Sequence, residues 1–178
     1  MPSFNLHRIR AGVLALGMFA GIALLAQAAN ASAAADAASR NKDIIGQAFD
    51  RWAGGGTDFF NEVLGPDVIW TIKGSGLSAG IFESRDVFID RAVRPFASRL
   101  STPVRPVRWQ VWADGDHVII NWDGEGMARD GVPYRNSYAW IFRMSGGQAA
   151  EVTAFLDLTP YDDVLRRVPA PVANGERP

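Results

Sequence analysis

The second half of the chain alternates apolar and polar residues with a period of two, which is typical of strands that bury one face. Four such extended runs are predicted at about 104–112, 117–128, 132–143 and 149–158. They are separated by the turn sequences Asp114-Gly115-Asp116, Arg129-Asp130-Gly131 and Ser145-Gly146-Gly147. Because short Asp-Gly and Gly-Gly turns join neighbouring antiparallel strands, the pattern predicts a meander of consecutive hairpins.

The first half has helical spacing instead. Apolar residues between Ile44 and Trp52 recur every three or four positions, and Gly54-Gly55-Gly56 should end that helix. A short helix, a strand over 67–72 and a glycine-rich loop follow. Ser84 should cap another helix, which Pro95 should kink or end because proline lacks an amide hydrogen. Helices followed by a meander predict an α+β domain, with the N-terminal helices packed on one face of a curved antiparallel sheet.

The N-terminus has the three parts of a secretory signal peptide. Arg8 and Arg10 precede an uncharged apolar stretch over 11–27, and small residues follow it, with cleavage motifs at Ala29-Asn30-Ala31 and Ala31-Ser32-Ala33. The sequence therefore predicts a signal peptide over 1–33 and an exported protein, periplasmic or secreted, whose membrane contact is limited to that peptide. The alternative is an uncleaved anchor, since the stretch approaches the length of a spanning helix.

The composition narrows the available chemistry. Net charge is −1, which gives no reason to expect binding to nucleic acid. The chain has no cysteine and two histidines, His7 and His117, so thiolate chemistry and a metal site built from several histidines are excluded. We expect neither a metal nor a cofactor. Carboxylates, amides, hydroxyls, arginines and aromatic rings remain as the working groups.

Several segments resemble the SnoaL-like polyketide cyclase branch of the nuclear-transport-factor-2-like superfamily. The helix with Phe49 and Trp52 carries the likeness, together with GPDVIWTIKGSGLSAGIFESRDVF, RNSYAWIFR and EVTAFLDLTPYDDVL. The resemblance implies a SnoaL-like domain over 36–166. The proline-rich composition of the C-terminus predicts a disordered tail over 167–178. It further implies a cone in which the curved sheet, with helices on its concave face, encloses one pocket. Relatives of this fold include isomerases, cyclases, dehydratases, epoxide hydrolases and non-catalytic modules, so the fold alone does not select a function.

Asp157 is the first candidate catalytic residue. It follows Phe155 where the last predicted strand ends, and a carboxylate beside an aromatic ring would be partly desolvated, which raises its pKa toward that of a general base or acid. The strand end is similar to that of the limonene-epoxide hydrolases, and this resemblance implies that Asp157 activates a water molecule. The alternative is that Asp157 caps the following helix or pairs with an arginine.

Asp123 is the second candidate catalytic residue. The same resemblance places Asp123 where those hydrolases keep a second carboxylate, and places Asn121 where they keep an arginine. An amide cannot supply that positive charge, so Asn121 is a candidate ligand-binding residue instead. The alternative is a solvated outer face, because alternation shows which residues share a face but not which face is buried.

A candidate ligand pocket follows from the third run. Asn136, Tyr138 and Trp140 alternate and should share one face. Together with Trp70 and Phe155 they could wall an apolar pocket in which Asn136 and Tyr138 orient the ligand. The alternative for Trp140 is simple core packing.

Two functions remain open. The first is cofactor-independent acid/base chemistry of the isomerase, cyclase or hydrolase type, using Asp157 on a small apolar molecule. The second is a non-catalytic ligand-binding or dimerisation module of the same fold. Because an exposed sheet needs cover, we also expect a homodimer.

Overall fold

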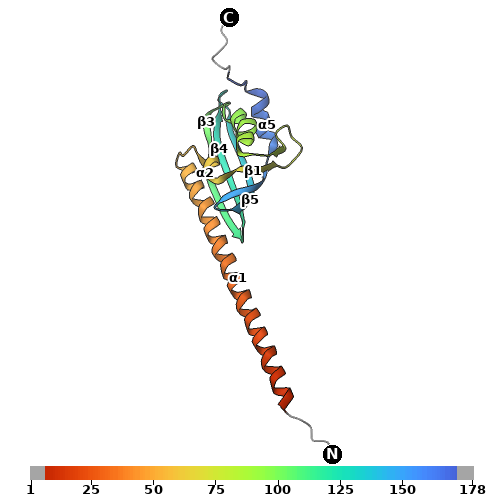
Figure 1. The fold of residues 1–178 in the computed structure, drawn as a ribbon. Helices are drawn as coiled ribbons and strands as arrows, with labels where there is room; N and C mark the ends of the chain where they lie inside the picture. Colours follow the sequence, from red (N-terminus) through yellow and green to blue (C-terminus); the bar gives the residue numbers. More distant parts are fainter. Residues whose placement is uncertain (1–6, 172–178) are drawn as a thin grey trace, which may run out of the picture.

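The computed structural model describes residues 7–171, and it describes side chains for residue 27 and residues 29–171. Its elements are α1 (His7–Ala53), α2 (Phe59–Val63), β1 (Leu64–Ile72), β2 (Gly80–Phe82), α3 (Arg85–Phe88), the π-helical turn η1 (Ile89–Val93), α4 (Arg94–Ala97), β3 (Leu100–Asp114), β4 (His117–Ala128), β5 (Pro133–Ser145), β6 (Gln148–Leu156) and α5 (Leu158–Arg167). Figure 1 shows α1 lying along the sheet and continuing past its end.

The predicted meander is confirmed. Strands β3, β4, β5 and β6 pair antiparallel in sequence order, and the hairpin turns use glycines with positive φ, such as Gly115 at 54° and Gly146 at 59°. The full sheet has the order β2-β1-β6-β5-β4-β3. The α+β fold with a curved, unclosed sheet is therefore as predicted, with one parallel pairing, between β1 and β6, inside the otherwise antiparallel sheet.

The two faces of the sheet differ in burial, as an alternating pattern requires. The inner face is the one covered by helices, and Ile45, Ala48 and Phe49 of α1 are buried in its core. In β4, Val118 and Ile120 point to this face and are fully buried. The outer face is the opposite one, without a covering helix among the described elements, and β4 exposes Ile119 there.

The helix after Ser84 begins as predicted and continues past Pro95. The Ser84 hydroxyl accepts a hydrogen bond from the amide of Val87 (3.1 Å), which confirms the cap. Pro95, however, does not end the helix, which continues to Ala97. The π-helical turn η1 ends at Val93, two residues before Pro95. A π-helical turn is wider than an α-helical one, which eases the clash of the proline ring with the preceding turn.

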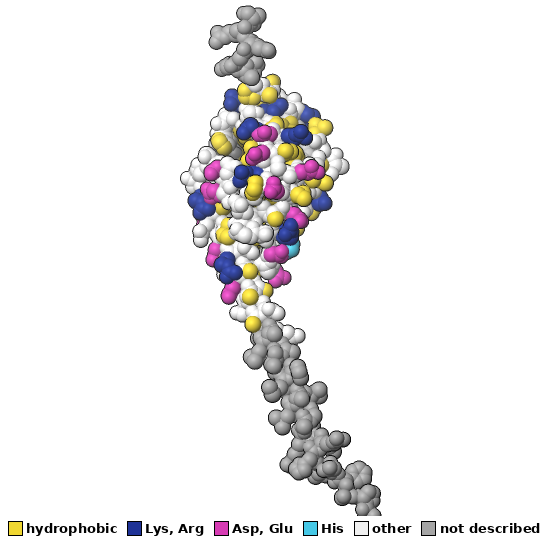
Figure 2. All heavy atoms as spheres, in the orientation of Figure 1, with side chains coloured by type: hydrophobic (Ala, Val, Ile, Leu, Met, Phe, Trp, Pro, Cys, Tyr) yellow, Lys and Arg dark blue, Asp and Glu magenta, His cyan; other side chains and the backbone are white. Residues whose placement is uncertain are grey.

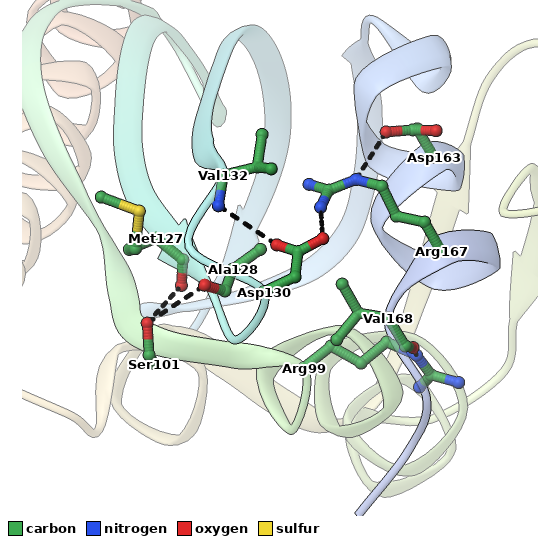
Figure 3. A network of polar contacts seen from close by, with 9 residues as sticks. All are labelled: Arg99, Ser101, Met127, Ala128, Asp130, Val132, Asp163, Arg167 and Val168. Carbon is green, nitrogen blue, oxygen red and sulfur yellow. Dashed lines mark hydrogen bonds and ion pairs between the residues drawn. The ribbon is translucent and has the colours of Figure 1, made fainter.

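The ordered C-terminal region extends past the predicted start of the tail. Arg167 is the last residue of α5, and Val168 is buried against the base of the sheet. Figure 3 shows Arg167 between Asp163 and Asp130, so it ties α5 to the β4–β5 turn. Arg167 and Val168, at the start of the predicted tail, thus belong to α5 and to a buried cluster, and residues 172–178 lie outside the described residues.

The predicted signal peptide lies largely outside the described side chains, and residues 1–6 are not described at all. Among the described residues, none of the helices combines the length and the apolar character that a membrane-spanning helix needs. Acidic and basic side chains are interspersed over the domain face seen in Figure 2, in keeping with the near-neutral net charge.

Candidate functional site

A cavity of about 250 Å³ lies between the inner face of the sheet and the helical segment from α3 to α4. Its lining is mostly aromatic and aliphatic, drawn from α1, α2, β1, the α3–α4 segment, β3–β6 and α5: Trp52, Thr57, Phe60, Trp70, Ile72, Phe88, Ala92, Val93, Phe96, Ala97, Leu100, Pro103, Val104, Arg105, Trp122, Tyr138, Trp140, Ala154, Leu156 and Tyr161. Among these described lining residues, only Arg105 has a charged side chain at neutral pH.

The aromatic wall is fixed by ring contacts. Trp140 lies edge-on to Trp70, with ring centroids 5.1 Å apart, and edge-on to Trp122 at 4.8 Å. The ring of Trp122 stacks on that of Tyr138, at 3.9 Å and 8°. Such contacts hold each ring in place beyond the effect of burial alone. The cavity therefore has a preformed aromatic wall.

Tyr138 is the end of a buried hydrogen-bond chain. The Asn136 amide Nδ2 donates to the Tyr134 hydroxyl (2.9 Å), and the Tyr134 and Tyr138 hydroxyls share a hydrogen bond of 2.7 Å. The amide is itself fixed by the main chain of Asp157, because Nδ2 donates to its carbonyl (2.8 Å) and Oδ1 accepts from its N–H (3.2 Å). Asn136 thus supports Tyr138 from behind the cavity wall and is not itself among the residues that line the cavity.

Burial keeps both phenols protonated. It raises the pKa of Tyr134 to about 12, and it raises the pKa of Tyr138 well above its usual value. The Tyr134 hydroxyl accepts a hydrogen bond from Asn136. If all hydrogen bonds of this network run in the same direction, Tyr134 in turn donates to Tyr138. Cooperative polarisation favours that direction. Either hydroxyl can be the donor in the hydrogen bond that the two tyrosines share, and when Tyr134 donates, the Tyr138 hydroxyl proton is available to a bound molecule.

Gly124 makes room for this arrangement. A Cβ atom at this position would lie 2.7 Å from the Trp122 ring, 2.8 Å from Val104 and 3.2 Å from the Tyr138 ring. The first two of these contacts are too short for a side chain unless its neighbours move, so the packing of Trp122 beside this position favours a glycine. Gly124 was not among the residues predicted from the sequence, although a glycine inside an alternating strand often marks such a close approach.

Asp157 does not lie where a general base would be needed. It is exposed, and its Oδ1 accepts from the amide of Thr159 (2.9 Å), so it is the N-cap of α5. The predicted desolvation is absent because the strand ends at Leu156 and the next side chain turns back to the helix. Phe155 was predicted to wall the pocket, but it points to the outer face and is 46% exposed.

Asp123 and Asn121 both belong to the outer face. The Asp123 carboxylate accepts from the Ser137 hydroxyl (2.7 Å) and from Arg108 Nη2 (2.6 Å), and these hydrogen bonds, that of Ser137 first, hold its pKa below the usual value. The exposed Asn121 donates from Nδ2 to the main-chain carbonyl of Tyr138 (3.1 Å). Neither side chain lines the cavity, so the solvated alternative for this pair describes the structure.

Of the eight residues proposed from the sequence, three line the cavity: Trp70, Trp140 and Tyr138. Trp52, Trp122 and Arg105 were not proposed and line it as well. Trp122 lies on the same strand face as the buried Val118 and Ile120, and that alternation was the signal available for it. No comparable signal marked Arg105.

The fold and this cavity together define the class of protein. The model of the SnoaL-like domain family matches residues 45–152, and the chain belongs to that family. Among curated proteins, no sequence match was found.

Solved structures of low sequence identity share the fold. Bal32a, from a soil-derived mobile gene cassette, is 18% identical over 72% of this chain and 98% of its own, with a TM-score of 0.60. A putative SnoaL-like polyketide cyclase from Jannaschia sp. CCS1 is 18% identical over 75% and 96%, with a TM-score of 0.56. TerC, co-crystallised with polyporic acid, is 15% identical over 71% and 98%, with a TM-score of 0.58.

Proposed function

We propose that this protein binds one small, mostly apolar molecule in the inner-face cavity and does so without carboxylate or histidine chemistry. The observation that carries the proposal is the lining, in which aromatic rings surround about 250 Å³ and no Asp, Glu or His takes part among the described residues. A general base must lie within hydrogen-bond reach of the proton that it removes. Asp157 and Asp123 are bound to other groups outside the cavity, which favours binding over acid/base catalysis.

The polar groups of the wall suit a ligand with hydrogen-bond acceptors. The Tyr138 hydroxyl can donate, as described above. The Nε1 atoms of Trp70 and Trp122 are buried and have no acceptor among the described residues. A buried donor without a partner costs about 1–3 kcal/mol, so an acceptor brought by a ligand close to either ring would offset part of that cost. The co-crystal of TerC with polyporic acid supports the idea that this fold accommodates a small organic molecule.

Calorimetric titration tests this proposal. We expect the mature protein to bind at least one neutral two-ring probe, such as 2-acetylnaphthalene, with one site per chain and a raised melting temperature. Tyr138→Phe should weaken binding of 2-acetylnaphthalene by up to about ten-fold while leaving naphthalene binding unchanged, because only the ketone accepts a hydrogen bond. Absence of both heat and stabilisation across a panel of such probes would refute the proposal.

The cellular location is also a proposal. The arginines, apolar stretch and small residues of 1–33 support export and cleavage after Ala31 or Ala33. N-terminal sequencing of the protein from the extracytoplasmic fraction tests this. A mature N-terminus at Ser32 or Ala34 is the expected result, and an intact N-terminus in the membrane fraction would support the anchor instead.

The outer face supports a homodimer. Its exposed apolar side chains include Ile69, Trp112, Ile119 and Phe155, which are between 42% and 46% exposed. Apolar side chains gathered on one uncovered sheet face favour association with a second copy.

A further inference from the structure

Arg105 lies at the rim of the cavity. Its Nη1 donates to the carbonyls of Trp52 (3.3 Å) and Gly56 (2.5 Å), and its Nη2 donates to that of Gly55 (3.1 Å). Trp52 and Thr57 both line the cavity, so the guanidinium sits where the end of α1 meets the opening. The turn depends on glycine, since Gly55 has a φ of +106° and a Cβ at Gly56 would lie 2.8 Å from a carbonyl of α1.

The charge of Arg105 is not neutralised by a carboxylate. No Asp or Glu lies within 4.0 Å of its guanidinium among the described residues. Its cross-strand partner Glu125 pairs with Arg135 instead (3.1 Å). Asp58, next along the chain from Thr57, accepts from Asn61 (2.7 Å). The cation is therefore surrounded by neutral carbonyls at the edge of an apolar cavity.

Arg105 also has N–H groups that make no hydrogen bond to the described residues. A guanidinium carries five N–H groups, and the three hydrogen bonds to carbonyls account for both of those on Nη1 and one on Nη2. The Nε–H and the second Nη2 proton have no acceptor among the described residues. The hydroxyl of Thr57, at the same rim, also makes no hydrogen bond within the described part of the chain.

We propose that the ligand of this cavity is a small aromatic or alicyclic carboxylic acid, whose ring lies between the tryptophans and whose carboxylate pairs with Arg105. This inference rests on the proposed function and specifies its ligand. A carboxylate is the group that a guanidinium with free donors recognises best, and charge-assisted hydrogen bonds are about twice as strong as neutral ones. The cavity has the volume of about eight water molecules at about 30 Å³ each, which suits a molecule of one or two rings.

A structural role of Arg105 accounts for part of its contacts. Basic side chains often bond the last carbonyls of a helix, and Arg105 does so at the end of α1. That role predicts no preference for the charge of a ligand. The two roles are therefore separated by comparing an acid with a neutral molecule of the same shape.

The test uses 2-naphthoic acid and its neutral isostere 2-naphthamide, titrated calorimetrically at pH 7 into the mature protein. We expect the acid to bind at least about ten-fold more tightly than the amide, as one charge-assisted contact provides. Arg105→Gln should remove this preference by weakening the acid alone. Arg108→Gln is the matched control, because Arg108 lies on the same strand, faces the outer side and pairs with Asp123, and it should change neither affinity.

The outcomes are distinct. Equal binding of both probes by the unaltered protein, or an undiminished acid preference in Arg105→Gln, overturns the inference and leaves the proposed function standing. If neither probe binds and no member of the neutral panel binds, the inference and the proposed function are both overturned. If Arg105→Gln fails to fold, Arg105→Lys replaces it as the variant that keeps the charge. The inference is then decided by the pH dependence of probe binding to the unaltered protein. Acid affinity should then fall as the probe itself is protonated, with amide affinity flat, and parallel curves for the two probes overturn the inference.

Discussion

Replacing Ala154 by leucine tests whether the inner face is hollow. Ala154 is 1% exposed, lies on the inner face of β6 opposite Trp140, and lines the cavity. Leucine adds three carbon atoms. If they enter empty space, burial contributes about 0.8 kcal/mol per carbon, or about 2.4 kcal/mol in all. Loss of side-chain freedom removes about 0.5–1 kcal/mol. We therefore expect Ala154→Leu to stabilise the fold by about 1.5 kcal/mol.

Ala149→Leu is the matched control. Ala149 lies on the same strand, is fully buried and does not line the cavity. Extra carbons there must displace packed atoms, which costs about 1–3 kcal/mol. Urea unfolding of the two variants gives both changes in free energy, and the sign should differ between them.

Ligand affinity gives a second readout of the same pair. The added side chain occupies part of the space that the ligand needs, so Ala154→Leu should weaken binding of 2-acetylnaphthalene while raising stability. Ala149→Leu, compared at a temperature where both variants are folded, should retain the affinity. Equal destabilisation of the fold by the two variants would refute the presence of a usable cavity at Ala154.

Three further predictions concern groups outside the cavity. Asp157→Ala should cost about 1 kcal/mol of stability through loss of the α5 cap and leave ligand affinity unchanged, whereas a loss of affinity would contradict the capping role. The pKa of Tyr134 is about 12 in the folded protein, so between pH 10 and 12 the unfolded chain loses that proton first and stability falls as pH rises. Urea unfolding across that pH range should show that Tyr134→Phe reduces the loss of stability by up to about 1.4 kcal/mol per pH unit. An unchanged slope of stability against pH would contradict the raised pKa of Tyr134. The protein should sediment as a dimer and Phe155→Glu as a monomer, while a monomeric unaltered protein would exclude the dimer.

The strand meander could be predicted from the sequence because turns and strand alternation depend on local sequence patterns. Turn glycines such as Gly115 and Gly146 need no tertiary information, and the alternation in β5 places Tyr138 and Trp140 together on the buried side. Alternation within β4 left open which side is buried. The packing of α1 against the sheet decides that, and it places Asp123 outside.

The candidate site was less predictable because the period of two fails at Asp157, which was proposed for the site, and at Arg105, which lines it. Asp157 follows the last residue of β6, so the geometry of the helix start directs its side chain and the strand alternation no longer applies. Arg105 lies in β3 between register shifts at Thr102/Arg105 and Pro106/Arg108. A bulged strand re-aims its side chains, and counting along the sequence therefore cannot place Arg105 at the rim.

The nuclear magnetic resonance signals of the tryptophan indole N–H groups test the central claim most directly. Of the six tryptophans, Trp52, Trp70, Trp122 and Trp140 line the cavity, whereas Trp112 is 46% exposed on the outer face. On addition of a small apolar probe we expect the signals of the cavity tryptophans to shift together and that of Trp112 to stay. A shift confined to Trp112, or no shift at saturating probe, would contradict ligand binding inside the cavity.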